Sequence, residues 1–459
     1  MKTSTPVTLT LCQHIITCPS ERIGMVQIGS TRQKMLDMVG CLIAGAMAQG
    51  NGTFVHDWAR KYTKEEAAHS VPLFALPAHI SAPIASVLCR SYDFEVMNYG
   101  HLYATLLPVA LAVGAEERAT GRQIATAIVL AVDFCTRLNA AAGPGMPGNT
   151  DPVGTSTMLA ATAAAGRLVG LTPQQLSYAF GFAMNMFCGS FQNLWEGAMS
   201  FKFLQGWSAH CAVTAVQMAK LNWTAPFDAL LGPRGYFACN TANGCQNPEH
   251  LTQHLGDDFY DFAVYKLYPG CRFTHAALEN ALVIHRQMGV PAPWQKIQIF
   301  LSHGVKSTFV CQPFDIDSPS QCKALFSLRY AVACALWEGA VSPQSYTGEA
   351  MKRLLSQVDI NKIQLLEEPS YQGDECRLTI SGGAGKEVNA YTPYACGEKE
   401  RPVTSGELEA KYWNNVQFHM FFDHKKAQIL RDACLGIWDL PNVTPFFENL
   451  RLGDLQLNL

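Results

Sequence analysis

Helical periodicity in the first half of the chain constrains the fold more than any other feature. Up to about residue 225, apolar residues recur three and four positions apart, which places them on one face of a helix. Many of these positions carry alanine or glycine, whose small size lets helices pack closely. The pattern predicts a large helical bundle, with helices over residues 36–47, 107–117, 123–138, 156–168 and 174–186.

Residues that commonly begin or end helices support this interpretation. Thr172, Pro173 and Gln175 form a capping box with proline at the first helical position, so we expect a helix to begin there. Gly121 and Gly170 stand where the preceding helices are expected to stop.

The pattern changes after about residue 260. Residues 296–300 and 376–380 alternate as half-buried strands do, and residues 362–366 could form another strand. Helices are predicted between them, over residues 321–338 and 348–357. After Pro402 the helical pattern returns, over residues 407–416, with Ser405 as the expected cap, and over residues 423–434.

The expected fold class is therefore mainly α with an α+β insert. Residues 1–261 and 404–459 would form one all-helical domain from both chain ends, and residues 262–403 a smaller α+β lid domain. A chain of 459 residues is several times longer than a common domain of about 100–150 residues, which fits this division. Ligands often bind where domains meet, so we expect a site at this junction.

The amino-acid composition indicates which classes of binding partner to expect. Only 15% of the residues are charged, against about 25% in ordinary soluble proteins, while 48% are hydrophobic. Such a chain buries much of its surface, so we expect a homo-oligomer, most simply a homodimer. The 34 Lys and Arg residues nearly balance the 37 Asp and Glu residues, and no basic run could follow a phosphate backbone. We therefore expect no nucleic-acid partner.

We also expect a cytoplasmic protein that does not cross a membrane. Residues 1–22 lack the continuous apolar core of a secretory signal, and the long uncharged stretch over residues 168–195 is interrupted by polar residues. The sixteen cysteines include no CxxC pair, and most lie in apolar helical segments. Such cysteines are typical of free core thiols in a reducing compartment.

Two polar groups bracket a loop before an apolar helix. Asp93 and His101 could transfer a proton at neutral pH, because the imidazole has an unperturbed pKa of about 6.5. The alternative is a helix cap at Asp93 and a hydrogen-bonded loop histidine at His101. The two residues alone do not decide between these interpretations.

Cations in apolar surroundings form the other candidate sites. Lys202 lies among aromatic residues, so it must reach solvent, pair with a carboxylate such as Asp133 or Glu196, or wait for an anionic ligand. Near the expected start of the lid, Lys266 and three further polar residues could bind a substrate with several carboxylates or could form an ordinary surface loop; the three are Cys271, Arg272 and His275.

Sequence motifs argue against metal or cofactor chemistry. His250 and His254 have the spacing of one helical turn, but a third zinc ligand at useful spacing is missing. The GxGxxG spacing at residues 143–148 contains two prolines and follows a predicted helix rather than a strand, so it is not a dinucleotide-binding fingerprint. A GxSxG elbow and an HExxH motif are absent from the sequence. We expect neither a metal nor a cofactor.

Taken in order, several segments resemble the MmgE/PrpD family, and the resemblance covers nearly the whole chain. The segments are Leu36–Cys41 with Ala44 and Gly45, the Asp93–His101 loop followed by Pro108, the Lys202 segment, Lys266–His275, Phe326–Tyr330 and Gly406–Lys411. The family includes 2-methylcitrate dehydratases, cis-aconitate decarboxylases and iminodisuccinate epimerases. The resemblance implies a helical domain from both chain ends, an inserted α+β lid, and cofactor-free proton transfer next to a carboxylate.

The resemblance also implies which residues surround the substrate cleft. They are Asp93, His101, Lys202, Lys266, Tyr330 and His275. The chain departs from cis-aconitate decarboxylases at Asp151 and Cys271, where those enzymes carry histidines, and at Met97, where threonine is common. These departures weaken the case for that decarboxylation. Asp151 and Cys271 stay among the expected substrate contacts.

The resemblance leads to a hydro-lyase that dehydrates a citrate-like or alkylcitrate-like di- or tricarboxylate. Lys202, Lys266 and Arg272 would bind substrate carboxylates. His101, oriented by Asp93, would take the proton alpha to a carboxylate. Tyr330 or His275 would give a proton to the departing hydroxyl. The alternatives are a decarboxylase or an epimerase that shares the first step, and a carboxylate-binding relative without catalysis.

Overall fold

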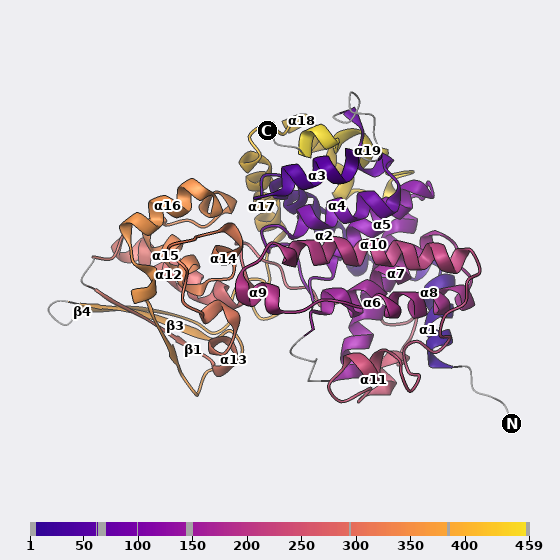
Figure 1. Cartoon of the computed structure of the whole chain (residues 1–459), viewed down its shortest axis with the longest axis horizontal. Coiled ribbons are helices and arrows are strands. Elements are labelled where there is room, and N and C mark those ends of the chain that lie inside the picture. Colours follow the sequence, from indigo (N-terminus) through magenta and orange to yellow (C-terminus); the bar gives the residue numbers. More distant parts are fainter. Residues whose placement is uncertain are drawn as a thin grey trace.

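A helical bundle and a smaller lobe with a four-stranded sheet make up the molecule (Figure 1). The computed structural model describes residues 6–60, 62, 70–98, 100–143, 150–292, 295–382 and 386–455. The mainly α fold class with a small α+β portion is confirmed.

Both ends of the chain contribute to the bundle. Helices α17 and α18, from the C-terminal part, pack against α2 from the N-terminal part (Figure 1). The bundle helices are α1 Val7–Thr17, α2 Met25–Gly45, α3 Asn51–Arg60, α4 Ala78–Arg90, α5 Tyr103–Glu116, α6 Gly121–Ala142, α7 Ser156–Leu168, α8 Pro173–Asn185, α9 Gln192–Glu196, α10 Ser200–Lys220, α11 Tyr236–Asn240, α17 Ser405–Phe418, α18 His424–Leu435 and α19 Thr444–Asn449.

The lobe is built on a sheet with strand order β2-β1-β3-β4. Strand β1 pairs in parallel with β2 and antiparallel with β3, which pairs antiparallel with β4. Helix α12 packs against β3, β4 and α15. The elements are α12 His275–Met288, β1 Lys296–Leu301, α13 His303–Lys306, α14 Gln321–Leu325, α15 Leu328–Glu338, α16 Gly348–Gln357, β2 Gln364–Glu367, β3 Cys376–Gly382 and β4 Lys386–Thr392. The limits 262–403 for the lid remain our proposal, as does the homodimer.

Several predicted element boundaries are wrong. Residues 321–338 form two helices instead of one, because the Ser327 side chain accepts a hydrogen bond from the backbone N–H of Tyr330 and so begins α15. Gly121 begins α6 rather than ending α5, since Thr120 forms a capping box there. Thr404, not Ser405, caps α17. Strand β4 has no predicted counterpart.

His250 and His254 do not lie one turn apart on a single helix. His250 lies in the short 3-10 helix Pro248–Leu251, and His254 follows it with a φ of 51°. The capping box at Thr172 is confirmed, and Gly170 follows the end of α7 with a φ of 71°.

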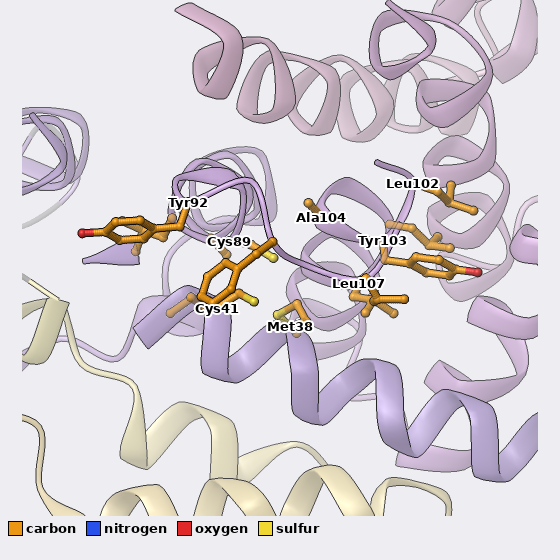
Figure 2. Close-up of a cluster of buried hydrophobic side chains, with 14 of the residues drawn as sticks. Met38, Cys41, Cys89, Tyr92, Leu102, Tyr103, Ala104 and Leu107 are labelled. Carbon is orange, nitrogen blue, oxygen red and sulfur yellow. The ribbon is translucent and has the colours of Figure 1, made fainter. Parts of the chain in front are cut away.

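Small residues allow close helix contacts in the core. A Cβ atom at Gly45 on α2 would lie 1.8 Å from the carbonyl oxygen of Leu88 on α4, so a larger residue would separate these helices. Figure 2 shows the adjoining cluster, in which Met38 and Cys41 of α2 face Cys89 of α4 and Leu107 of α5. This packing supports the loop between α4 and α5.

The cysteines act as small core residues. All sixteen lie in the described ranges as free thiols, and most are buried. Burial raises the pKa of Cys41 and Cys89 well above the usual value, so these thiols stay protonated.

Helix α6 is, within the described residues, the one helix long and apolar enough to cross a membrane. However, 89% of its 18-residue apolar window is buried inside the protein. It also carries an ion pair, in which Nε of Arg137 lies 2.8 Å from Oδ2 of Asp133. This is the environment of a bundle core helix.

Candidate active site

A cavity of about 390 Å³ lies between the bundle and the lobe, at the junction where the sequence suggested a ligand site. Its volume falls within the range of about 300–1,000 Å³ that small-molecule sites occupy. One wall carries charged groups and another carries aromatic rings. The lining residues are Arg90, Asp93, Met97, Gly100, His101, Asp151, Pro152, Phe191, Leu194, Trp195, Lys266, Cys271, Arg272, Phe273, Ser307, Thr308, Phe309 and Phe326.

The loop between α4 and α5 supplies the acid–base groups. Asp93 and His101 both have left-handed backbones, with φ of 52° and 51°. Aspartate and histidine adopt this conformation more readily than most residues, yet it stays uncommon and concentrates at functional sites. The conformation turns both side chains toward the cavity wall that they share.

A buried ion pair holds this loop in place. The Nζ atom of Lys411, on α17, lies 2.6 Å from Oδ1 of Asp37, on α2, and also donates to the backbone oxygen of Phe94. The other Asp37 oxygen accepts a 2.6 Å hydrogen bond from the backbone N–H of Val96. The two chain ends therefore position the loop together.

Glu95 is the closest hydrogen-bond partner of His101. Nδ1 of His101 lies 2.6 Å from Oε1 of Glu95, whereas Nε2 lies 3.5 Å from Oδ1 of Asp93. An ionised carboxylate can only accept a hydrogen bond, so the ring proton belongs on Nδ1 and Nε2 is the basic atom. Glu95, rather than the expected Asp93, therefore makes the closer contact to His101 and holds its Nδ1.

The protonation of this pair follows from its surroundings. Burial and the charge of Arg90 lower the pKa of His101 to about 3. Burial would raise the pKa of Glu95, but Arg90 and His101 outweigh it and lower this pKa to about 2. At neutral pH the pair is a carboxylate and a neutral imidazole, the form that can accept a proton.

Asp93 holds two cations. Its Oδ1 contacts Nη1 of Arg90 and lies 3.1 Å from Nζ of Lys266, and its backbone oxygen lies 2.6 Å from the same ammonium. Burial lowers the pKa of Lys266 to about 7. A carboxylate ligand beside Lys266 would favour its charged form.

Two arginines in the cavity wall keep buried donors with no hydrogen-bond partner among the described residues. They are Nε of Arg90 and both Nε and Nη1 of Arg272. Nη2 of Arg272 lies 2.6 Å from Oε1 of Glu398, and its Nη1 lies 3.5 Å from Oδ2 of Asp374. A buried unpaired donor costs about 1–3 kcal/mol, so the protein does not fully satisfy these two guanidinium groups.

Asp151 and Cys271 also line the cavity. Oδ1 of Asp151 accepts a 3.0 Å hydrogen bond from the backbone N–H of Val153, at the start of a 3-10 helix. Burial raises the pKa of both the Asp151 carboxyl and the Cys271 thiol. A protonated Asp151 could give a proton to a ligand.

Lys202 is not among the residues that line this cavity. It borders a separate hollow of about 220 Å³, and its Nζ lies 2.6 Å from the backbone oxygen of Gln49 and 2.8 Å from Oδ1 of Asn51. The suggested carboxylate partners bond elsewhere: Asp133 with Arg137 and Glu196 with Gln192. Burial lowers the pKa of Lys202 to about 8.

Tyr330 and His275 are buried in the lobe, outside the cavity lining. The Tyr330 hydroxyl donates to the backbone oxygen of Ser345 at 2.7 Å. Nε2 of His275 lies 3.4 Å from the backbone oxygen of Gly270, which Lys266 also approaches at 3.4 Å. His275 therefore stands behind the segment that carries Lys266, and neither residue is placed to donate to a departing hydroxyl.

Sequence reasoning missed Arg90 and Glu95. Arg90 ends α4 three residues before Asp93, and Glu95 follows two residues later, so four charged residues stood within a short apolar stretch if His101 is included. Buried charges in close succession were the available signal. The pairing itself depends on the turn of the loop.

Asp93, Glu95 and His101 also have the donor types of a metal site, with ligand atoms within 4.8 Å of one another. Arg90 and Lys266, however, already contact the same carboxylates. Two cations at this distance would repel a divalent ion. The donor set therefore fits proton transfer better than metal binding.

Comparisons with known proteins agree over most of the chain. A family model described as the MmgE/PrpD N-terminal domain matches residues 10–246, and one described as the MmgE/PrpD C-terminal domain matches residues 268–437. No curated protein matches the chain in sequence.

Proposed function

Because the chain belongs to the MmgE/PrpD family, whose members include hydro-lyases and related enzymes, we propose that it is a cofactor-free lyase that dehydrates a citrate-like or alkylcitrate-like acid. The observation that carries this proposal is the His101–Glu95 pair, whose imidazole lines a cavity that three cations also line. The cations are Arg90, Lys266 and Arg272.

Proton abstraction is the first step. Nε2 of the neutral His101 takes the proton alpha to a substrate carboxylate, and Glu95 stabilises the imidazolium that forms. Asp93, at 3.5 Å from Nε2, adds a second negative charge beside it. The electron pair moves from the carbon–hydrogen bond toward the carboxylate, as in an enolate.

The cations stabilise this developing charge. Arg90, Lys266 and Arg272 line the cavity, so their positive charges lie beside a carboxylate that binds there. Fixed charges in a site that excludes water act more strongly than they would in solution.

The second step breaks the bond to the hydroxyl group. The enolate electron pair forms the carbon–carbon double bond while the carbon–oxygen bond breaks, and the hydroxyl takes a proton and leaves as water. Asp151 is the donor that we propose, because its carboxyl lines the cavity and burial raises its pKa. This role replaces the one expected for Tyr330 or His275.

Proton NMR in heavy water tests the proposal. The acids to screen are citrate, 2-methylcitrate, longer alkylcitrates, cis-aconitate and iminodisuccinate. An alkene that keeps every carboxylate supports dehydration. Solvent deuterium without an alkene indicates an epimerase, loss of carbon dioxide a decarboxylase, and binding without turnover a non-catalytic relative; any of these three contradicts the dehydratase.

A further inference from the structure

An aromatic ladder runs from the charged end of the cavity to its mouth. The Arg90 guanidinium lies 5.0 Å from the ring centroid of Phe201, which lies 4.9 Å from that of Phe326. Phe309 follows at 5.7 Å from Phe326, and Trp195 at 6.2 Å from Phe309. We call these four rings the aromatic ladder; Phe326, Phe309 and Trp195 line the cavity.

The ladder leaves apolar surface uncovered. The Trp195 side chain is 46% exposed, and Phe273 on the same cavity wall is 37% exposed. Phe191 and Leu194 extend the apolar wall. Water in contact with this wall would be released by an apolar ligand group, which favours binding.

A second hollow borders the same aromatic rings. A neighbouring hollow of about 140 Å³ shares Leu194, Trp195, Phe309 and Phe326 with it, and adds Pro313 and Phe314. Lys323 and Asp315 border this hollow as an ion pair, with Nζ and Oδ2 2.6 Å apart.

The charged end is largely neutralised by the protein itself. Arg90 and Lys266 contact Asp93, and Arg272 contacts Glu398 and Asp374. Arg90 and Arg272 line the cavity, and Nε of each has no hydrogen-bond partner among the described residues. Two arginines suit two of the carboxylates of a citrate-like or alkylcitrate-like acid.

From these observations, and resting on the proposed function, we propose that the substrate is an acid with at least two carboxylates and an apolar substituent longer than a methyl group. The carboxylates lie at Arg90 and Arg272, and the substituent lies along Phe326, Phe309 and Trp195. Trp195 and Phe309 are then specificity-determining residues, since they contact the part of the substituent farthest from the reacting atoms.

Calorimetry with unreactive succinates tests the proposed apolar substituent, because it measures binding affinity without any turnover. The probes are methyl-, propyl-, pentyl- and heptylsuccinate, which keep the two carboxylates and lack a leaving group. We expect the affinity to rise about fourfold for each added methylene that the ladder covers. An affinity that does not change with chain length would overturn the inference.

Two variants of the aromatic ladder and one control variant test whether these rings cause the dependence of affinity on chain length. Trp195→Ala and Phe309→Ala should each lower the affinity for heptylsuccinate at least tenfold and leave methylsuccinate within twofold. Trp223→Ala, which removes a ring that is 61% exposed outside the cavity lining, should change neither. Equal losses for both probes in Trp195→Ala, the more exposed ladder position, would contradict the assignment.

The outcomes separate this inference from the proposed reaction. Affinity that grows with chain length, without turnover of any acid, would support the substrate class and refute the lyase. Dehydration of citrate at least as fast as that of its longer alkyl derivatives, with no chain-length effect on binding, would support the lyase and refute the substrate class. Absence of binding by every succinate would refute the inference.

Discussion

The Glu95 carboxylate and the His101 imidazole form a 2.6 Å hydrogen bond through Oε1 and Nδ1. Because Nδ1 carries the ring proton in this bond, Nε2 is unprotonated. It lies 3.5 Å from Oδ1 of Asp93. His101 lines the cavity while Glu95 is fully buried behind it, so the pair resembles a base and its orienting group.

Glu95→Gln should lower turnover about 10²–10⁴-fold, because the amide can no longer hold the productive tautomer of His101. Glu95→Asp should recover part of the loss, and steady-state kinetics would measure both. Melting temperatures report whether each variant folds, and Glu409→Gln, which alters a half-buried carboxylate paired with Arg431 outside the cavity lining, is the matched control. A folded Glu95→Gln enzyme with full turnover would remove Glu95 from the mechanism.

His101→Gln should lower turnover about 10²–10⁴-fold and abolish exchange of the substrate's alpha proton with solvent deuterium. Binding of an inert dicarboxylate should persist, since the arginines remain in place. NMR and calorimetry measure the two properties separately. Continued deuterium exchange at the wild-type rate would show that another group is the base.

Asp151→Asn should separate the two chemical steps. The amide still accepts the hydrogen bond from the Val153 N–H but cannot give a proton to the departing hydroxyl. We expect alkene formation to slow about 10²–10⁴-fold while alpha-proton exchange continues. If both rates fall together, or neither changes, Asp151 is not the proton donor.

Lys266 should set the alkaline limit of kcat/KM. Its pKa of about 7 in the free enzyme means that the ammonium is present below this pH and is lost as the pH rises through it. Affinity for a carboxylate substrate, and with it kcat/KM, should therefore fall above about pH 7. Bound carboxylate raises the pKa, so the corresponding limb of kcat should lie at higher pH.

Lys266→Arg provides the test of that assignment, because arginine keeps its charge across this range. The alkaline fall of kcat/KM should disappear in the variant, even where the maximal rate is lower. An unchanged fall near pH 7 would assign the limb to a different group.

Lys411→Met should destabilise the protein by about 3–5 kcal/mol, because it leaves the buried Asp37 carboxylate without its cation. Chemical denaturation measures the loss, and faster hydrogen exchange at the Val96 amide would show that the Asp93–His101 loop loosens. The double variant Asp37→Leu, Lys411→Met should recover much of the stability, since no buried charge remains unpaired. Equal stability of the single variant and the wild type would mean that the pair does not hold the loop.

Lys202→Met should leave dicarboxylate affinity within about twofold, because Lys202 borders a different hollow from the one that holds the acid–base groups. Calorimetry with methylsuccinate measures this, and Arg272→Met, which removes a cation from the cavity wall, is the contrasting variant. A large loss of dicarboxylate affinity in Lys202→Met would show that Lys202 binds the substrate.

Local sequence patterns predicted most of the helices because burial of one helical face repeats every three to four residues, whatever the partner. The predicted strands 296–300 and 376–380 lie within β1 and β3 for the same kind of reason, with a period of two. Strand β4 was not predicted, because its residues, Lys386–Thr392, include few apolar positions. Its structure depends on pairing with β3.

The mainly helical class, the cation-rich segment at Lys266 and Arg272, and the polar loop from Asp93 to His101 could be predicted because each is a local pattern of residue types. The contact between Glu95 and His101, the place of Arg90 in the cavity lining, and the absence of Lys202, Tyr330 and His275 from that lining could be seen in the folded chain alone. The reason is geometric: hydrogen bonds act over about 3 Å, whereas the residues concerned lie on elements far apart in the chain and meet through packing alone.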